Sequence, residues 1–246
     1  LFEREFRSDV STKIRFCKHH EAHLYGVVYP SGYPRCLAVG LDGEGDGRSG
    51  MVATFDGCTL TPLKEYNEAQ SLGNFYTGAI SLLGYRRFDE YKVMGLAPYG
   101  DPNVYREMFA QFYTLLPDGD FAFIPPGAQL SLAGRYGLLN HVRRKGQPFT
   151  QVHKDLAAGI QHTLERLAFH VLRHFRKSTG EKNLCLSGGV AHNCTLNGKV
   201  LYANLFEQMF VQPAAHDAGN ALGAALVTSR EEGVTLKPKK MPHVYW

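Results

Sequence analysis

The sequence feature that most constrains the fold is an alternation of short strands and helices in the last quarter of the chain. Apolar runs lead into turns that contain glycine, and helical patterns follow these turns. The predicted order is strand 183–186, turn 187–189, helix 190–203, strand 208–211 and helix 217–230. Strands that are connected through helices pair in parallel, so this part of the chain predicts an α/β fold with a parallel sheet.

The first quarter of the chain predicts antiparallel strands instead. A helix from Lys18 to Tyr29 precedes an apolar strand, Cys36 to Leu41, and the acidic turn Asp42-Gly43-Glu44-Gly45-Asp46-Gly47 follows that strand. Two further strands, at 51–55 and 60–66, complete an antiparallel meander. Both kinds of pairing in one chain indicate a mixed α/β protein.

The middle of the chain is predicted to be helical, with one irregular connection. Residues 68–116 have helical patterns that glycines interrupt, and residues 117–148 are rich in Pro, Gly and polar side chains. A long helix spans 150–179, with one apolar stripe and with Gly180 as its C-terminal cap. The connection therefore separates two regions of regular structure.

We expect three parts of unequal size from these patterns. Residues 1–148 are a partial first lobe with the irregular connection, 149–236 are a second α/β lobe, and 237–246 are a linker. The chain does not begin with Met. We expect a missing first strand before it and a further domain after it.

The composition excludes several classes of protein. No apolar run reaches the roughly 18 residues that a membrane-spanning helix needs, so we expect no membrane association. The chain has 27 Lys and Arg residues against 23 Asp and Glu residues, and this net charge of +4 is too scattered for a nucleic-acid-binding surface. Five cysteines, an odd number without a CxxC pair, predict a reducing, cytoplasmic setting and no disulfide framework.

Two histidines on the first predicted helix form a candidate metal site. His19 and His23 are four residues apart and lie on one face of a helix, whereas His20 points about 100° away. The local sequence HHEAH differs from the HExxH motif of zincin metalloproteases, which are therefore disfavoured. Surface or core histidines are the alternative interpretation of this pattern.

Three further segments place reactive groups at strand ends and helix starts. Asp42 ends an apolar strand, and we interpret its carboxylate as a metal ligand. An ordinary turn aspartate is the alternative interpretation. Gly188-Gly189 lies between a strand and a helix, where backbone N–H groups approach a phosphate. Asp217 and Gly219 open the last helix and make a second terminus that faces an anion or a metal. Structural turns and helix caps are the alternative for the last two segments.

In this order the motifs resemble the carbamoyltransferase family of nodulation-type and antibiotic-tailoring enzymes. The resemblance covers nearly all 246 residues. It rests on HHEAH at 19–23, YKVMGLAPYG at 91–100, LSGGVAHNCTLN at 186–197 and DAGNALGAA at 217–225. It implies an actin-like ATPase fold, that of the sugar kinase and heat-shock superfamily, with two lobes around a cleft for nucleotide and metal.

The resemblance also implies the residues of the site. The implied ligands of a divalent metal, with iron(II) expected, are His19, His23, Asp42 and Asp217. The residues implied to contact ATP or a carbamoyl-adenylate are Lys92, Gly188, Gly189, Val190, Asn193, Gly219 and Asn220. Two histidines and two carboxylates also suit zinc or manganese, and a surface lysine is an equally good interpretation of Lys92.

The implied reaction uses carbamoyl phosphate and ATP to form a carbamoyl-adenylate, and then transfers the carbamoyl group to a hydroxyl of a small molecule or oligosaccharide. A cation and two helix starts stabilise the charge of the phosphate, and a base takes the hydroxyl proton. Family members carry the base in an N-terminal His-Asp segment and end in a YrdC-like domain. We expect both to lie outside these 246 residues, so no catalytic base is assigned.

Two related functions and one of another class stay open. The tRNA threonylcarbamoyl-adenosine synthesis protein and the hydrogenase-maturation carbamoyltransferase share the fold and much of the metal pattern. The scattered charge disfavours tRNA, and GGVAHN in place of GGVFQN disfavours the second relative. A catalytically inactive scaffold that binds a nucleotide is the non-enzyme alternative.

Overall fold

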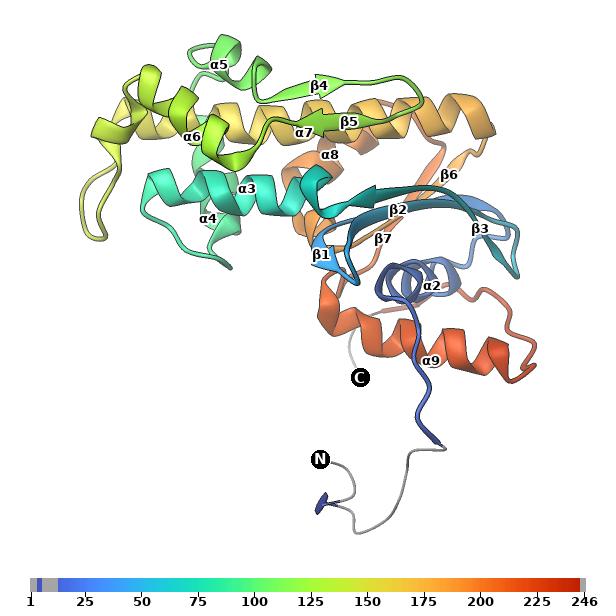
Figure 1. The fold of residues 1–246 in the computed structure, drawn as a ribbon. Helices are drawn as coiled ribbons and strands as arrows, with labels where there is room; N and C mark the ends of the chain where they lie inside the picture. The colour runs from blue at the N-terminus through green and yellow to red at the C-terminus, as the bar shows by residue number, and fades with distance from the viewer. Residues whose placement is uncertain (1–3, 6–12, 244–246) are drawn as a thin grey trace.

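A five-stranded sheet forms the centre of the computed structural model, which describes residues 4–5 and 13–243 (Figure 1). Its strands lie in the order β3-β2-β1-β6-β7. Their bounds are β1 Cys36–Gly45, β2 Arg48–Phe55, β3 Leu60–Asn67, β6 Asn183–Ser187 and β7 Gln208–Val211. The first three strands pair in antiparallel fashion, whereas β1, β6 and β7 run parallel to one another. The mixed α/β class predicted from the sequence is confirmed.

Helices cover both faces of this sheet (Figure 1). One face is covered by α2, with α9 packed against α2, while α3 and α7 lie on the other face. A small hairpin of β4 and β5 and the helices α4, α5 and α6 lie on the same side as α7. The bounds of these elements are α2 His19–Ser31, α3 Leu72–Ile80, α4 Glu90–Leu96, α5 Arg106–Ala110, β4 Tyr113–Leu115, β5 Phe121–Phe123, α6 Pro126–Arg135, α7 Gln151–Thr179, α8 Cys194–Tyr202 and α9 Asn220–Glu231.

Side-chain alternation along β1 separates two hydrophobic cores. Leu37, Val39 and Leu41 belong to the core under α3 and α7, while Cys36 and Ala38 belong to the core under α2. Successive side chains of a strand point to opposite faces, so an apolar strand buries both of its faces between two helical layers. This packing explains why the segment 36–41 is apolar at every position.

The structure differs from the sequence prediction at two connections. The strand β1 continues through the acidic segment to Gly45, and only Asp46-Gly47, with φ of 52° and 73°, forms the turn to β2. A two-residue hairpin turn of type I′ needs positive φ at both positions, and Asp-Gly meets this need. Residues 117–148 are more regular than predicted, because they contain β5, α6 and a short 3₁₀ helix at Leu138–His141.

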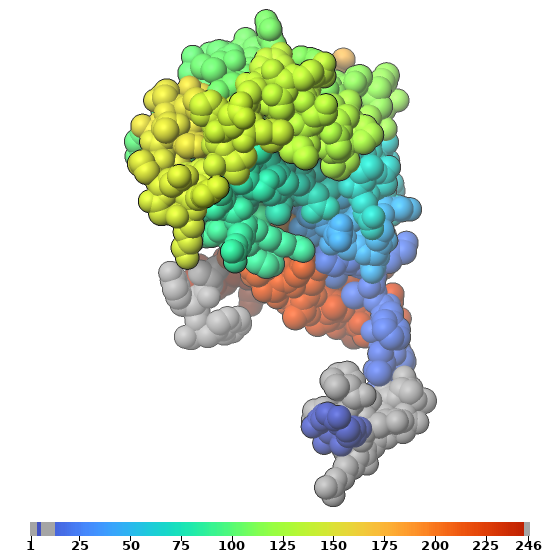
Figure 2. Space-filling view, turned by 60° about the vertical axis from the view of Figure 1, so that its left-hand side comes forward, coloured from blue at the N-terminus to red at the C-terminus, as the bar shows by residue number. Residues whose placement is uncertain are grey.

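The two halves of the chain contribute to the same sheet. Residues Leu37–Gly40 of β1 pair with β6. The range 1–148 and the range 149–236 therefore each supply strands to the centre of one sheet. The segment from α3 to α6 packs on the same side of the sheet as α7 and lies above α9 in Figure 2. The division of the chain into two domains at residue 148 stays a prediction.

The predicted linker 237–246 contacts α2 over its described part. Backbone N–H groups of Lys239 and Met241 donate to the carbonyl oxygens of Tyr29 and Pro30, at 2.9 Å and 2.8 Å. Residues 244–246 lie outside the described residues. None of the described helices is long and apolar enough to cross a membrane. All five cysteines are free thiols, and the cytoplasmic setting stays a prediction.

Candidate metal centre and ligand pocket

The candidate site lies at the carboxyl ends of the three parallel strands. Asp42 is near the end of β1, Gly189 follows β6, and Asp217 follows β7 in the short helix η7 that leads into α9. The carboxyl ends of parallel strands share one edge of a sheet, where α/β proteins bind their ligands. His19 and His23 come from the first turns of α2. Residues that are far apart in the sequence therefore meet at one edge of the sheet.

The four predicted metal ligands converge in the structure; they are His19, His23, Asp42 and Asp217. The Nε2 atoms of His19 and His23 lie 3.1 Å apart, and each lies 3.1 Å from Oδ2 of Asp42. The Oδ1 atom of Asp217 lies 3.5 Å and 3.4 Å from the same two nitrogens. Donors bound about 2.1 Å from one ion lie roughly 3.0–3.5 Å from one another in tetrahedral or octahedral geometry. The donor set therefore fits a divalent metal ion in both chemistry and spacing.

Burial and hydrogen bonds set the charges of this cluster. Burial raises the pKa of Asp42, but hydrogen bonds from both histidines and from the N–H of Gly189 outweigh it and hold that pKa well below its usual range. The hydrogen bond to Asp42 raises the pKa of His19. Burial, together with the charge of His19, lowers the pKa of His20 to about 4. Asp42 is therefore an anion at neutral pH and attracts a cation.

His20 lies outside the donor set, as its position on the helix predicts. It is not among the residues whose donor atoms lie within 4.8 Å of one another. Its Nε2 atom is buried and has no hydrogen-bond partner among the described residues.

Gly40 of β1 lets α2 lie close to the sheet. A Cβ atom at this position would lie 3.3 Å from Leu24 and 3.9 Å from His23.

The turn Gly188-Gly189 holds Asp42 from the side opposite to the histidines. The N–H of Gly189 donates to Oδ1 of Asp42 at 2.9 Å, which leaves Oδ2 to face the histidines. A Cβ atom on Gly189 would lie 2.8 Å from Oδ1 of Asp42. A Cβ atom on Gly188, which has φ of 83°, would collide with the carbonyl oxygen of Leu41. The turn therefore requires glycine at position 188, and glycine at position 189 leaves room for the carboxylate of Asp42.

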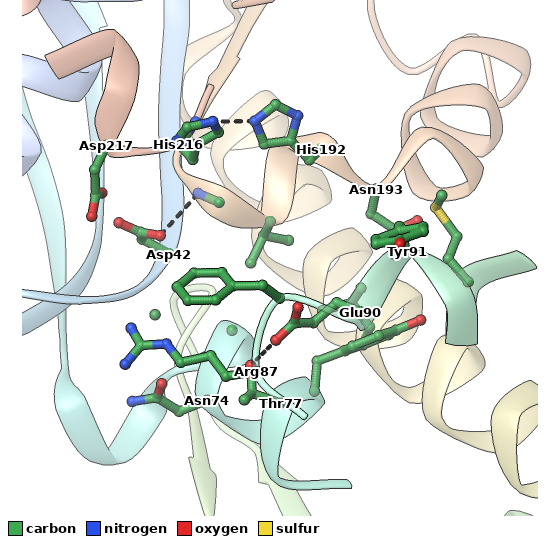
Figure 3. Close-up of a pocket in the computed structure, with 18 residues that line it drawn as sticks. Asp42, Asn74, Thr77, Arg87, Glu90, Tyr91, His192, Asn193, His216 and Asp217 are labelled. Atoms are coloured by element: carbon green, nitrogen blue, oxygen red, sulfur yellow. Dashed lines mark hydrogen bonds between the residues drawn. The ribbon is translucent and has the colours of Figure 1, made fainter. Parts of the chain in front are cut away.

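A pocket of about 570 Å³ opens beside the metal ligands (Figure 3). Asp42 and Asp217 lie on one side of it, and Asn74, Arg87 and Glu90 lie on the opposite side. Its walls come from α3, from the segment that leads into α4, and from the glycine turn after β6. Its volume lies within the range of roughly 300–1,000 Å³ found for small-molecule sites.

The structure brings only some of the predicted nucleotide residues to this pocket. Those that line it are Gly189, Val190 and Asn193. Those that do not line it are Lys92, Gly188, Gly219 and Asn220. Lys92 instead donates to Asp89 through Nζ at 2.6 Å, while Tyr91 and Met94 of the same motif do line the pocket. Tyr91 and Met94, rather than Lys92, therefore face the pocket from this motif, and the nucleotide contacts stay predictions.

A buried polar network behind Asn193 was not predicted. Gln161 on α7 exchanges two hydrogen bonds with Asn193, at 3.0 Å and 2.8 Å, and accepts a third from the hydroxyl of Tyr76 at 3.0 Å. Gln161 also donates to Glu165, which in turn pairs with Lys199. Gln161 and Glu165 lie four residues apart and therefore on one face of α7, and this spacing was the available signal. The network orients Asn193 at the pocket wall.

Comparison with known proteins places the chain in a family. The sequence model of the family described as "Carbamoyltransferase N-terminus" matches residues 3–226. The chain belongs to this family. It is 53% identical over 229 residues to nodulation protein NolO of Bradyrhizobium diazoefficiens, covering 93% of this chain and 41% of that protein. It is 49% identical over 251 residues to nodulation protein NolNO of Sinorhizobium fredii, covering 100% of this chain and 36% of that protein.

A solved structure supports the fold class. Full-length HypF in its phosphate- and nucleotide-bound form matches with a TM-score of 0.52 at 15% sequence identity, covering 90% of this chain and 44% of that chain. At this identity the likeness concerns the fold alone, and it confirms the actin-like fold that the sequence resemblance implied. The chain spans about two fifths of the length of the curated relatives it matches.

Proposed function

We propose that this chain is the metal-binding transfer region of an O-carbamoyltransferase. It transfers the carbamoyl group of a carbamoyl-adenylate, made from carbamoyl phosphate and ATP, to a hydroxyl group of a small molecule or oligosaccharide. Membership of the carbamoyltransferase family, four converging donor atoms and an adjacent pocket support the proposal. In the same proposal a YrdC-like domain of the whole protein makes the adenylate.

The metal in this proposal is held by the donor set described above. Two imidazoles and two carboxylates suit iron(II), zinc or manganese, and we propose iron(II) because the family resemblance implies it. A divalent cation at this position neutralises the phosphate of the adenylate and makes AMP a better leaving group. The buried anion of Asp42 attracts that cation, and the exposed carboxylate of Asp217 closes the donor set on the pocket side.

The chain's own residues orient the ligand. The N–H of Gly189 fixes the carboxylate of Asp42, and Val190 and Asn193 form the adjacent wall of the pocket. Of the two hydrogens on Nδ2 of Asn193, one is used by Gln161. The second hydrogen is available to a polar atom of the nucleoside.

The transfer step balances without a redox change. The acceptor oxygen forms a bond to the carbamoyl carbon while the bond from that carbon to the phosphate oxygen breaks. AMP leaves with the electron pair of the broken bond, and a base takes the hydroxyl proton. We assign no base among the described residues.

The observation that carries the proposal is the convergence of the four donors beside the pocket. In the full-length protein, His19→Ala and His23→Ala should each remove bound metal, as measured by elemental analysis after dialysis. His20→Ala is the matched control and should keep the metal, because His20 lies outside the donor set. Equal metal loss in all three variants would contradict the assignment.

Carbamoyl transfer itself is tested with carbamoyl phosphate, ATP and a panel of sugars and oligosaccharides. The metal-loaded protein should release AMP and yield a carbamoylated acceptor that mass spectrometry detects. Asp42→Asn should abolish the product while circular dichroism shows an intact fold. Metal-loaded protein that forms neither AMP nor product with any acceptor would favour the inactive scaffold.

A further inference from the structure

The outer nitrogens of the two candidate metal-binding histidines each face a polar side chain. The Nδ1 atom of His23 lies 3.4 Å from Oγ of Ser187, and Nδ1 of His19 lies 3.4 Å from Nδ2 of Asn220. The opposite ring nitrogens, Nε2, are the ones that converge on Asp42. A neutral imidazole carries its proton on one nitrogen only. The partner of Nδ1 therefore decides whether Nε2 has a lone pair free for a metal.

The sheet places Ser187 beneath its histidine. Ser187 ends β6 opposite Gly40 of β1, two residues after Cys185, whose side chain belongs to the core under α2. Its hydroxyl lies 3.5 Å from the carbonyl oxygen of Ala215 and donates to it. The lone pairs of Oγ are then free to accept the Nδ1–H of His23. Both side chains are buried, with 2% of each residue exposed, so water does not compete for these bonds.

Helix α9 places Asn220 beside the other histidine. Asn220 is the first residue of α9, directly after the short helix that carries Asp217. Its Oδ1 atom is buried and has no hydrogen-bond partner among the described residues. A half-turn of the amide exchanges its oxygen and nitrogen, two atoms that only the hydrogen-bond network distinguishes. The oxygen then faces Nδ1 of His19 and accepts a hydrogen bond from its N–H.

We infer that Ser187 and Asn220 are positioning residues of the metal centre. When the metal is bound, each accepts the Nδ1–H of its histidine, so that Nε2 points a lone pair at the metal instead of an N–H at Asp42. Histidines that bind metals generally donate their second N–H to such a partner. The inference rests on the metal centre proposed above, and it gives Asn220 a role other than contact with a nucleotide.

The inference is tested by the affinity of the full-length protein for Zn²⁺, measured by competition with a chelator. Ser187→Ala and Asn220→Ala should each raise the dissociation constant about 10- to 100-fold, as loss of such a partner does in other metal sites. Asn220→Asp keeps an acceptor oxygen and should restore most of the affinity. A role in stability alone would not produce this difference between Ala and Asp.

Asn197→Ala is the matched control. Asn197 also has a buried Oδ1 without a partner among the described residues, but its Nδ2 donates to the carbonyl oxygen of Ala191 rather than facing a histidine. This variant should bind Zn²⁺ as tightly as the wild type. Imidazole ¹⁵N spectra of the Zn²⁺-loaded wild type should show a protonated Nδ1 at His19 and His23.

The possible results separate the inference from the proposed metal centre. Wild-type affinity in folded Ser187→Ala and Asn220→Ala, with Zn²⁺ binding lost in His19→Ala, would overturn the inference and leave the metal centre in place. Wild-type protein that binds no Zn²⁺ would overturn both. Weaker binding in both Ala variants, with recovery in Asn220→Asp, supports the inference.

Discussion

The two sides of the pocket are built in opposite ways. On the metal side, His23 and Asp42 are buried and His19 is partly buried, while Asp217 is exposed. The N–H of Gly189 holds Asp42, and the hydroxyl of Ser187 lies against His23. On this side the positions of the donor atoms follow from the sheet and from α2, before any ligand binds.

The opposite side, formed by the segment 87–94, presents exposed side chains. Phe88 is 79% exposed and Tyr91 is 62% exposed, although both line the pocket. The guanidinium of Arg87 makes only a cation–π contact with Phe88 among the described residues. Metal binding needs donors fixed to within a fraction of an ångström, whereas a wall that contacts an organic ligand tolerates movement. We therefore expect the metal side to keep its geometry when a ligand binds, and the segment 87–94 to adjust to the shape of that ligand.

The largest expected effect comes from removing the charge on the metal side. Asp42→Asn keeps the size of the side chain but loses the anion that both histidines face. Metal at about 100 times its dissociation constant stabilises a folded protein by about 2.7 kcal/mol. Zn²⁺ should therefore raise the Tm of the wild type in thermal unfolding and leave that of Asp42→Asn unchanged.

Glu44→Gln is the control for this change. Glu44 lies on the same strand, but its carboxylate accepts a hydrogen bond from Asn74 and lies outside the donor set. Its Tm should respond to Zn²⁺ as the wild type does. A full Zn²⁺ response in Asp42→Asn would show that the metal side does not depend on this carboxylate.

A smaller effect is expected when the support of Asp42 is disturbed. In Gly189→Ala the new Cβ would lie 2.8 Å from Oδ1 of Asp42, so the carboxylate has to move. Metal affinity should fall about 10- to 100-fold, as it does when a ligand loses its supporting group. Gly198→Ala is the control, because a Cβ there meets nothing within 4 Å, and its Zn²⁺ affinity should stay unchanged. Equal affinities in the two variants would show that the glycine turn does not position Asp42.

The metal side could be predicted from the sequence because its patterns are local. Two histidines at i and i+4 share a helix face, and Asp42 directly follows an apolar run, so neither feature depends on distant residues. The partners Ser187 and Asn220 could not be assigned in this way. Their roles depend on the register of β6 against β1 and on the packing of α9 against α2, which no local pattern reports.

The opposite side was harder to predict, because the face that α4 turns toward the pocket depends on its packing against the rest of the protein. The motif 91–100 indicated a segment near the ligand, but Lys92 pairs with Asp89, one turn away. Tyr91 and Met94 take the positions that line the pocket. The acidic segment 42–47 was predicted as a turn because it is rich in glycine, yet Gly45 pairs with Arg48 of β2 and β1 extends to Gly45.

A third prediction concerns the network that joins the two sides behind the pocket. Gln161→Leu leaves the amide of Asn193 and the hydroxyl of Tyr76 without their buried partner. The free energy of unfolding should fall by about 1–3 kcal/mol, as measured by urea denaturation. Lys177→Leu, at an exposed position on the same helix whose side chain has no hydrogen bond or ion pair among the described residues, should change it by less than about 0.5 kcal/mol. A loss of the same size in both variants would mean that the network adds nothing beyond the helix itself.

The smallest expected effect tests whether the opposite side is held under backbone strain. Phe88 has φ of 75°, a left-handed conformation that costs a residue with a Cβ atom about 1–2 kcal/mol and glycine much less. Phe88→Ala and Phe88→Gly remove the same exposed ring, so their difference isolates the backbone. The Gly variant should be more stable than the Ala variant by about 1 kcal/mol in urea denaturation. Both should keep wild-type Zn²⁺ affinity, because Phe88 lies outside the donor set. If the two variants are equally stable, the wall carries no such strain; if either loses Zn²⁺, the two sides of the pocket are not independent.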